Sequence, residues 1–235
     1  MKVEIWSDVT CVFCYMSKRK FESAISVFKN ASDIEITWRS FQLLPDLKSE
    51  PHKSFYQSLS ENSGMSLEQS KAACDQVKDA AALVGLIYDF DKAKPVNTFN
   101  AHRFSHLAKA KGLQTEAEEL LFKSYFTDGR NIDDISTLVE LGTTLGLNSQ
   151  ETRTILEGDR YTSEVRDDIR VAQQMGVPGV PYYLFNSKHI VTGDRDTQAL
   201  LQVLEKAYAE WTEDNLQRQA EVTEGKSCMP GGRCQ

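Results

Sequence analysis

The pattern of apolar and polar positions predicts that the chain begins with a strand, a turn and a helix. Lys2–Trp6 alternate polar and apolar side chains and include β-branched residues, which is typical of a half-buried strand. Between Phe13 and Phe28, apolar residues recur at the spacing of an amphipathic helix. A second alternating run, Asp33–Arg39, follows. A strand, a helix and a strand in so short a segment form a βαβ unit, so we expect parallel strands with a right-handed crossover.

The middle of the chain, from Ser66 to about Asp159, predicts several amphipathic helices and no strand. Three residues with short polar side chains precede Glu or Gln by three positions, which is the capping-box pattern of a helix start. These pairs are Ser66 with Gln69, Thr115 with Glu118, and Asn148 with Glu151. We therefore expect a block of helices that bury their apolar faces against one another and against the sheet.

The last third of the chain returns to mixed structure. The pattern predicts a helix from about Ser163 to Met175, then strands at Tyr182–Phe185 and Lys188–Thr192 joined by an Asn186–Ser187 turn. A closing helix is expected from about Thr197 to Trp211. The predicted order is therefore β-α-β, a helical block, and α-β-β-α.

Two cysteines, Cys11 and Cys14, stand at the predicted junction of the first strand and helix. With Thr10 as the expected N-cap, Cys11 falls in the first helical turn, where free N–H groups and the helix dipole favour a thiolate. Cysteines so placed have a pKa of roughly 3.5–7.5. Cys14 lies one turn further on the same face, so it can attack a mixed disulfide formed on Cys11. This spacing predicts a redox pair with Cys11 attacking and Cys14 resolving.

Metal sites are the main alternative for these residue types. A CxxC is also half of a structural zinc site, but no second CxxC or Cys/His pair follows at the usual distance, so redox chemistry without a metal or cofactor is favoured. His102 and His106 are four apart on one predicted helix face. They lack the HExxH glutamate and a visible third ligand, so capping, packing or contact with substrate is favoured, and we list His102 as a substrate-binding candidate.

Charge and cysteine content narrow the class of partner and the compartment. The 235 residues carry a net charge of −7, which argues against nucleic acid or an anionic membrane surface. No apolar run approaches a membrane span and no leader is evident, so we expect a cytoplasmic protein. Five cysteines are too few and too scattered for a disulfide framework. Cys74, inside a predicted helix, is expected to be a small apolar filler.

Four groups of motifs, taken together with the order of elements, resemble one known family. They are Asp8 before Cys11-Val12-Phe13-Cys14-Tyr15, Asn97-Thr98 with Ala101-His102-Arg103, Tyr125-Phe126 with Asn131-Ile132, and Gly179-Val180-Pro181-Tyr182. In these the chain resembles the DsbA family of thioredoxin-fold oxidoreductases, and more narrowly its FrnE-like cytosolic branch, over roughly residues 1–211.

The resemblance implies an α/β fold in which a thioredoxin fold with a mixed central sheet carries a large all-helical insertion. Residues 1–45 and 160–211 would form the thioredoxin-fold domain, residues 46–159 the insertion domain, and residues 212–235 a flexible tail. It also implies that the Val180-Pro181 bond is cis and packs against the cysteines, with its backbone free to pair with an extended substrate. Val12-Phe13 stands where the family has Pro-Trp between the cysteines. The redox potential of the family therefore cannot be assigned to this chain.

The tail carries a further cysteine pair. Cys228 and Cys234 flank a Pro-Gly-Gly turn that can bring their side chains together. FrnE-like proteins often have such a pair, and we predict a redox relay that exchanges disulfides with Cys11 and Cys14. The alternatives are thiols without a role and an incidental metal chelator.

Three functions compete at this stage. The first is a disulfide oxidoreductase that acts on protein or small-molecule disulfides and thiols and is recycled by a thiol reductant or oxidant. The second is a glutathione-dependent isomerase or transferase of the DsbA-like kappa type, but that branch usually has serine where this chain has Cys11. The third is a non-enzymatic zinc-binding or holdase-like module. The sequence favours the first, an enzyme.

Overall fold

A four-stranded mixed sheet forms the centre of the computed structural model, which describes residues 1–50 and 52–223, with side chains described through residue 216. The strands are β1 (Lys2–Ser7), β2 (Glu35–Ser40), β3 (Tyr182–Phe185) and β4 (His189–Thr192), in the order β2-β1-β3-β4. Strand β1 pairs parallel with β2 and antiparallel with β3, and β4 runs antiparallel to β3. The mixed sheet and the parallel βαβ unit predicted from the sequence are confirmed.

Helices cover both faces of this sheet because β1 alternates its side chains between them. Val3 and Ile5 pack with residues of α1 (Val12–Val27) and α9 (Thr197–Thr223) on one face. Trp6 points to the opposite face and packs with α8 (Thr162–Gln174). All three side chains are buried, so β1 lies in the middle of the core. This burial fixes the position of its C-terminal end, which the two cysteines follow.

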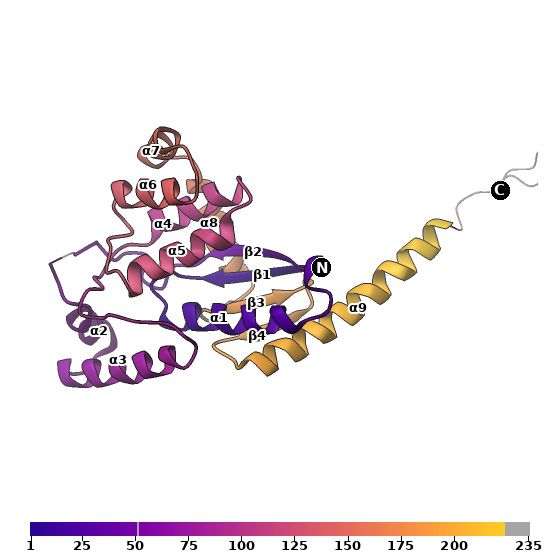
Figure 1. Cartoon of the computed structure of the whole chain (residues 1–235), viewed down its shortest axis with the longest axis horizontal. Helices are drawn as coiled ribbons and strands as arrows, with labels where there is room; N and C mark the ends of the chain where they lie inside the picture. The colour runs from indigo at the N-terminus through magenta and orange to yellow at the C-terminus, as the bar shows by residue number, and fades with distance from the viewer. Residues whose placement is uncertain (51, 224–235) are drawn as a thin grey trace, which may run out of the picture.

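The helical block predicted from Ser66 to about Asp159 is confirmed, and one further helix precedes it in the segment between β2 and α8. Its helices are α2 (Phe55–Ser63), α3 (Leu67–Ala82), α4 (Phe99–Lys109), α5 (Gln114–Phe126), α6 (Ile135–Thr144) and α7 (Ser149–Glu157). They gather at one end of the sheet, beside the start of α1 (Figure 1). One apolar cluster joins Val9, Cys11 and Tyr15 to Phe104 and Phe122 of this segment, so the helical segment and the start of α1 share a core.

The capping predictions are confirmed at two of the three helix starts. Ser66 forms a reciprocal capping box with Gln69, and the Asn148 side chain accepts the Glu151 N–H. The third pair, Thr115 with Glu118, is wrong, because α5 begins at Gln114 with Leu113 as its N-cap. Those two side chains have other partners: the Thr115 hydroxyl accepts from the Trp38 indole N–H, and Glu118 is buried and accepts from the Ser105 hydroxyl.

The closing helix is longer than the sequence pattern predicts. Helix α9 continues past Trp211 to Thr223 and leaves the body of the molecule (Figure 1). Residues 212–223 contain neither Pro nor Gly and include good helix formers, and Asp214 pairs with Lys188, in the turn before β4, at 2.6 Å. Residues 212–223 are therefore helix rather than the start of a flexible tail. Cys228 and Cys234 lie outside the described residues. No helix in the described part of the chain is long and apolar enough to cross a membrane.

Candidate functional site

Cys11 is positioned by a tight turn at the end of β1. Its backbone N–H donates to the Asp8 carbonyl at 2.9 Å, and the helix begins at Val12 with Cys11 itself as the N-cap residue. The prediction that Thr10 caps this helix is wrong by one residue, because the turn from Asp8 to Cys11 must close before the helix can start. The N-cap position places the Cys11 side chain where the unpaired N–H groups of the first turn and the positive end of the helix dipole stabilise an anion.

The thiol of Cys11 lies against the loop that precedes β3. Its Sγ donates to the Val180 carbonyl oxygen at 3.6 Å, although the two residues are 169 positions apart in the chain. The Val180-Pro181 peptide bond is cis, as the resemblance implies. The Cys11 side chain is 6% exposed and lies next to the backbone of this loop.

Cys14 lies one turn further along α1, and its side chain is only 1% exposed. Burial raises the pKa of the Cys14 thiol, and the neighbouring Cys11 raises it further, while the Ser7 hydroxyl and the Asp8 N–H act in the opposite direction. Both cysteines are free thiols in this structure. Cys14 is therefore the covered member of the pair and Cys11 the more accessible one, in the order expected from the sequence.

Behind the cysteines, Asp8 faces His102 in the interior. One Asp8 carboxylate oxygen accepts the Leu43 N–H at 2.8 Å, and the other lies 3.6 Å from His102 Nε2. His102 Nε2 also lies 2.9 Å from the Phe41 carbonyl oxygen. Burial alone would lower the pKa of His102, but the Asp8 carboxylate, the charge of Glu118 and the Phe41 carbonyl raise it overall. His102 is thus in contact with the turn that carries Cys11, and its role as a substrate contact stays a prediction.

His106 does not join His102 at a shared metal site. Its Nε2 lies 3.1 Å from an Asp168 carboxylate oxygen and 3.2 Å from the Ser40 hydroxyl. Across residues 1–50 and 52–223, no three His, Cys, Asp or Glu side chains are grouped as metal ligands. Sequence reasoning did not single out Asp168, because a single acidic residue on a polar helix carries no signal of the partners that folding brings to it.

Apolar side chains form the surface next to Cys11. Phe13 is 47% exposed and Leu43 is 44% exposed. Beside them a recess of about 180 Å³ begins at Thr10 and is lined mainly by apolar residues that include Leu44, Leu47 and Phe55. Since loop 41–50 and helix α2 form much of this recess, the helical segment contributes to the surface that surrounds the thiol.

Two tyrosines attach helix α1 to the helical segment. The Tyr88 hydroxyl donates to the carbonyl of Val12, the residue after Cys11, at 2.7 Å. The Tyr15 ring stacks on Phe122 at 4.9 Å between centroids, and its hydroxyl donates to Glu119 at 2.7 Å. The sequence offered no signal for the Tyr88 contact, which joins residues 76 positions apart.

Comparison with known proteins identifies relatives over almost the whole chain. The family model described as a DSBA-like thioredoxin domain matches residues 2–205. The crystal structure of a probable DsbA oxidoreductase from Streptomyces coelicolor is 32% identical, with a TM-score of 0.83, and the match covers 100% of this chain and 98% of that one. The Bacillus subtilis protein YwbO is 25% identical over 190 residues, 77% of this chain and 85% of the relative.

A more distant solved structure shares the fold alone. The cytosolic disulfide reductase DsbM from Pseudomonas aeruginosa, solved with GSH, is 16% identical with a TM-score of 0.61. The match covers 92% of this chain and 100% of that one.

Proposed function

The chain belongs to the DsbA-like thioredoxin-domain family, and from this premise we propose that it is a thiol–disulfide oxidoreductase whose reacting groups are Cys11 and Cys14. The observation that carries the proposal is the pair of free thiols at the start of α1, the outer one against the Val180 carbonyl and the inner one buried. Membership of the FrnE-like branch stays a prediction that rests on the motifs.

The proposed reaction moves two electrons from the cysteine pair to a substrate disulfide. The Cys11 thiolate attacks one substrate sulfur, the substrate S–S bond breaks, and the leaving sulfur takes up a proton. Cys14 then loses its proton and attacks Cys11 Sγ. This second attack releases the other substrate thiol and leaves a Cys11–Cys14 disulfide. The reverse sequence oxidises a dithiol substrate, and the redox potentials of pair and partner decide the direction.

The different burial of the two thiols supports this division of roles. The raised pKa of Cys14 keeps it protonated while Cys11 forms the mixed disulfide. Once Cys11 is bonded to substrate, its charge is gone, so one of the causes that raise the Cys14 pKa is removed and the second attack becomes easier. His102 stays a proposed substrate contact, and it would also help to hold the turn before α1, because it faces the Asp8 side chain while the Asp8 carbonyl accepts the Cys11 N–H.

We propose that substrates lie as extended chains along Val180 and Pro181 and place an apolar side chain in the recess beside Thr10. In this proposal residues 1–45 and 160–211 carry the reaction, and residues 46–159 shape the substrate surface. A thiol reductant or oxidant recycles the pair, and glutathione is one candidate because the DsbM structure was solved with GSH. The tail pair, Cys228 and Cys234, remains a proposed relay.

The experiment is reduction of insulin by the protein in the presence of a thiol reductant, followed by light scattering. Cys11→Ser should abolish turnover, and Cys14→Ser should accumulate a mixed disulfide that mass spectrometry detects under non-reducing conditions. Cys74→Ser is the matched control, because burial raises the pKa of Cys74 to about 11 and keeps it inert. Unchanged turnover in Cys11→Ser would overturn the proposal.

A further inference from the structure

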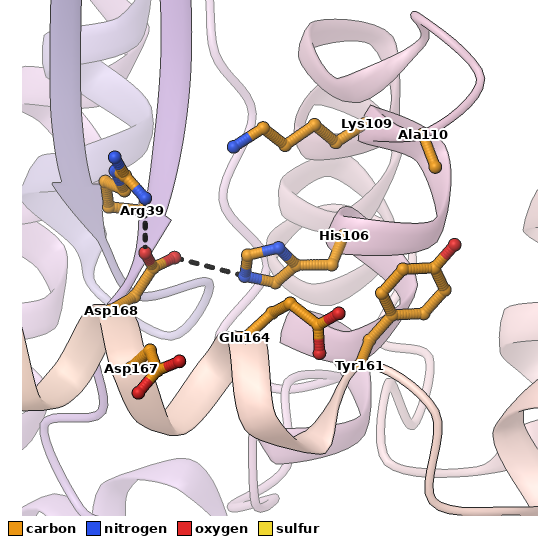
Figure 2. A pocket seen from close by; sticks show the side chains of 8 residues that line it. All are labelled: Arg39, His106, Lys109, Ala110, Tyr161, Glu164, Asp167 and Asp168. Carbon is orange, nitrogen blue, oxygen red and sulfur yellow. Dashed lines mark hydrogen bonds and ion pairs between the residues drawn. The ribbon is translucent and has the colours of Figure 1, made fainter.

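A second cavity, of about 520 Å³, opens between β2, α4 and α8. Eight residues line it: Arg39, His106, Lys109, Ala110, Tyr161, Glu164, Asp167 and Asp168 (Figure 2). The lining includes neither active-site cysteine nor Val180. The volume falls within the range of small-molecule sites in proteins, roughly 300–1,000 Å³, and most of the lining side chains carry charge.

Asp168 supplies a fixed charge at the base of this cavity that is already satisfied within the protein. It accepts from Arg39 at 2.7 Å, from the Ser40 N–H at 3.0 Å, and faces His106 at 3.1 Å. Burial by itself would raise the pKa of Asp168, but these three partners lower it overall. Asp168 therefore stays ionised and serves to orient His106 rather than to bind a ligand.

His106 presents an unused nitrogen to the cavity. Its side chain is 6% exposed, its Nε2 faces Asp168, and its ring stacks on Tyr161 with 6.5 Å between centroids. The second ring nitrogen, Nδ1, makes no hydrogen bond to any residue that the structure describes. Figure 2 shows it on the side of the ring that faces Lys109. A buried imidazole held from two sides, with one nitrogen left over, is an oriented hydrogen-bonding group for a ligand.

Opposite charges flank that imidazole without pairing. Among the described residues, neither the Lys109 ammonium nor the Glu164 carboxylate takes part in an ion pair, and the nearest polar partner of Glu164 is the Ser163 hydroxyl at 2.9 Å. Figure 2 shows Lys109 above the His106 ring and Glu164 below it. Partial burial and the charge of Arg39 lower the pKa of Lys109. Arg39 and the Lys109 ammonium repel each other, and an anion bound beside Lys109 would offset this repulsion.

We propose that this cavity binds a small zwitterion of the amino-acid or short-peptide class. The ligand's carboxylate lies against Lys109 on the side of Arg39, and its ammonium group lies against Glu164, with the His106 ring between the two charges. A simple anion such as phosphate would face Glu164 and Asp167, and a simple amine would face Lys109 and Arg39. Only a ligand that carries both charges complements both the basic pair, Lys109 and Arg39, and the acidic pair, Glu164 and Asp167.

The test is an NMR titration of protein labelled with ¹⁵N-histidine, in which the ring nitrogens of His106 report occupancy. Glycylglycine is the probe, and N-acetylglycylglycine and glycylglycinamide are matched controls that each lack one charge. We expect glycylglycine to shift the His106 signals and to bind at least tenfold more tightly than either control. Lys109→Gln and Glu164→Gln should each weaken its binding at least fivefold.

Lys111→Gln is the control variant, because Lys111 lies two residues further along and pairs with Glu151 instead of lining the cavity. It should leave the affinity unchanged. The proposal is overturned if either singly charged control binds as well as glycylglycine, or if Lys111→Gln weakens binding as much as Lys109→Gln. It is equally overturned if neither glycylglycine nor any of the twenty free amino acids moves the His106 signals. This test does not use insulin reduction. A failure of the zwitterion proposal can therefore be told apart from a failure of the proposed redox function.

Discussion

Cys11 and Cys14 lie three positions apart, yet their thiols have different surroundings. Cys11 meets the start of a helix and a carbonyl from a distant loop, whereas Cys14 is almost fully covered and lies against the Ser7 hydroxyl at the end of β1. Reaction of the reduced protein with iodoacetamide should therefore modify Cys11 first, and peptide mapping by mass spectrometry identifies the modified residue. Earlier modification of Cys14 would reverse the assigned roles. The position of Cys11 depends on the turn from Asp8 to Cys11. Substitution of His102, which faces the Asp8 side chain, should therefore have a measurable effect.

His102→Gln should make the stability of the protein less dependent on pH. The folded-state pKa of His102 is raised, mainly by Asp8 against the effect of burial. Its stabilising contribution is therefore fully present below the unfolded value of about 6.5 and is lost as pH rises through the folded pKa. Replacing this buried, charge-assisted partner should cost about 1.5–3 kcal/mol at pH 6 and less at pH 9, as measured by urea unfolding. A loss that is the same at both pH values would contradict the ion pair with Asp8.

Single residues were predictable where a local spacing carries the chemistry. The CxxC pair was found from its spacing, because both members lie on one helix and their relation is fixed by the helical repeat. Asp168 and Tyr88 were missed since each acts on a partner far away in the chain, Ser40 and Val12 respectively. Hydrophobic periodicity reports which face of a helix is buried and says nothing about which polar partner it meets there.

At the scale of elements, the Tyr88 hydroxyl joins the helical segment to α1 at the backbone carbonyl of Val12, which lies between the two cysteines. Tyr88→Phe removes the hydrogen bond to the Val12 carbonyl and keeps the ring that stacks on Phe126. We expect a loss of about 1 kcal/mol in the free energy of unfolding. Tyr125→Phe is the control in the same aromatic cluster, because its hydroxyl makes no hydrogen bond to a described residue. Equal losses in the two variants would show that the Tyr88 hydroxyl contributes nothing specific.

Helix α3 offers a simpler check of a local signal. Ser66→Ala removes the side chain that accepts the Gln69 N–H, which should cost about 1 kcal/mol of stability. Ser23→Ala, an exposed serine within α1 whose hydroxyl bonds the Arg19 carbonyl, should change stability by less than about 0.5 kcal/mol. Thermal unfolding followed by circular dichroism measures both. Equal melting temperatures for the two variants would show that the Ser66 cap does not contribute to stability.

Element boundaries were predictable where the local sequence decides them and were wrong where a tertiary contact does. Ser66 and Asn148 cap helices that start on the surface, where no other partner competes for their side chains. Thr115 is drawn to Trp38 and Glu118 to Ser105, so α5 starts elsewhere. The end of α9 was missed for a different reason. The second half of this helix is polar and shows no apolar periodicity, although its residues favour a helix.

For the whole molecule, the order of elements was predictable because the segments differ in period, two residues for the strands and about 3.6 for the helices. The contact between the Val180 loop and Cys11 was available only through resemblance, since nothing local connects them. The tail pair remains a prediction: Cys228→Ser with Cys234→Ser should lower insulin turnover at least twofold at limiting reductant and leave the melting temperature unchanged. Truncation after Thr223 keeps α9 and should have the same effect. Full turnover in both variants would leave the tail cysteines without a role.

The central place of β1 in the sheet has a consequence for how each copy of the protein is made. Strand β1 is synthesised before β3, which is its second neighbour in the sheet, and Cys11 is synthesised 169 positions before the residue whose carbonyl it contacts, Val180. At roughly 5–20 residues per second, that partner leaves the ribosome roughly 8–34 s after the cysteine. During this interval the nascent chain carries Cys11 without its carbonyl partner and β1 with an unpaired edge. Each molecule therefore passes through a stage at which Cys11 can meet any nearby disulfide before the Val180 loop lies against it.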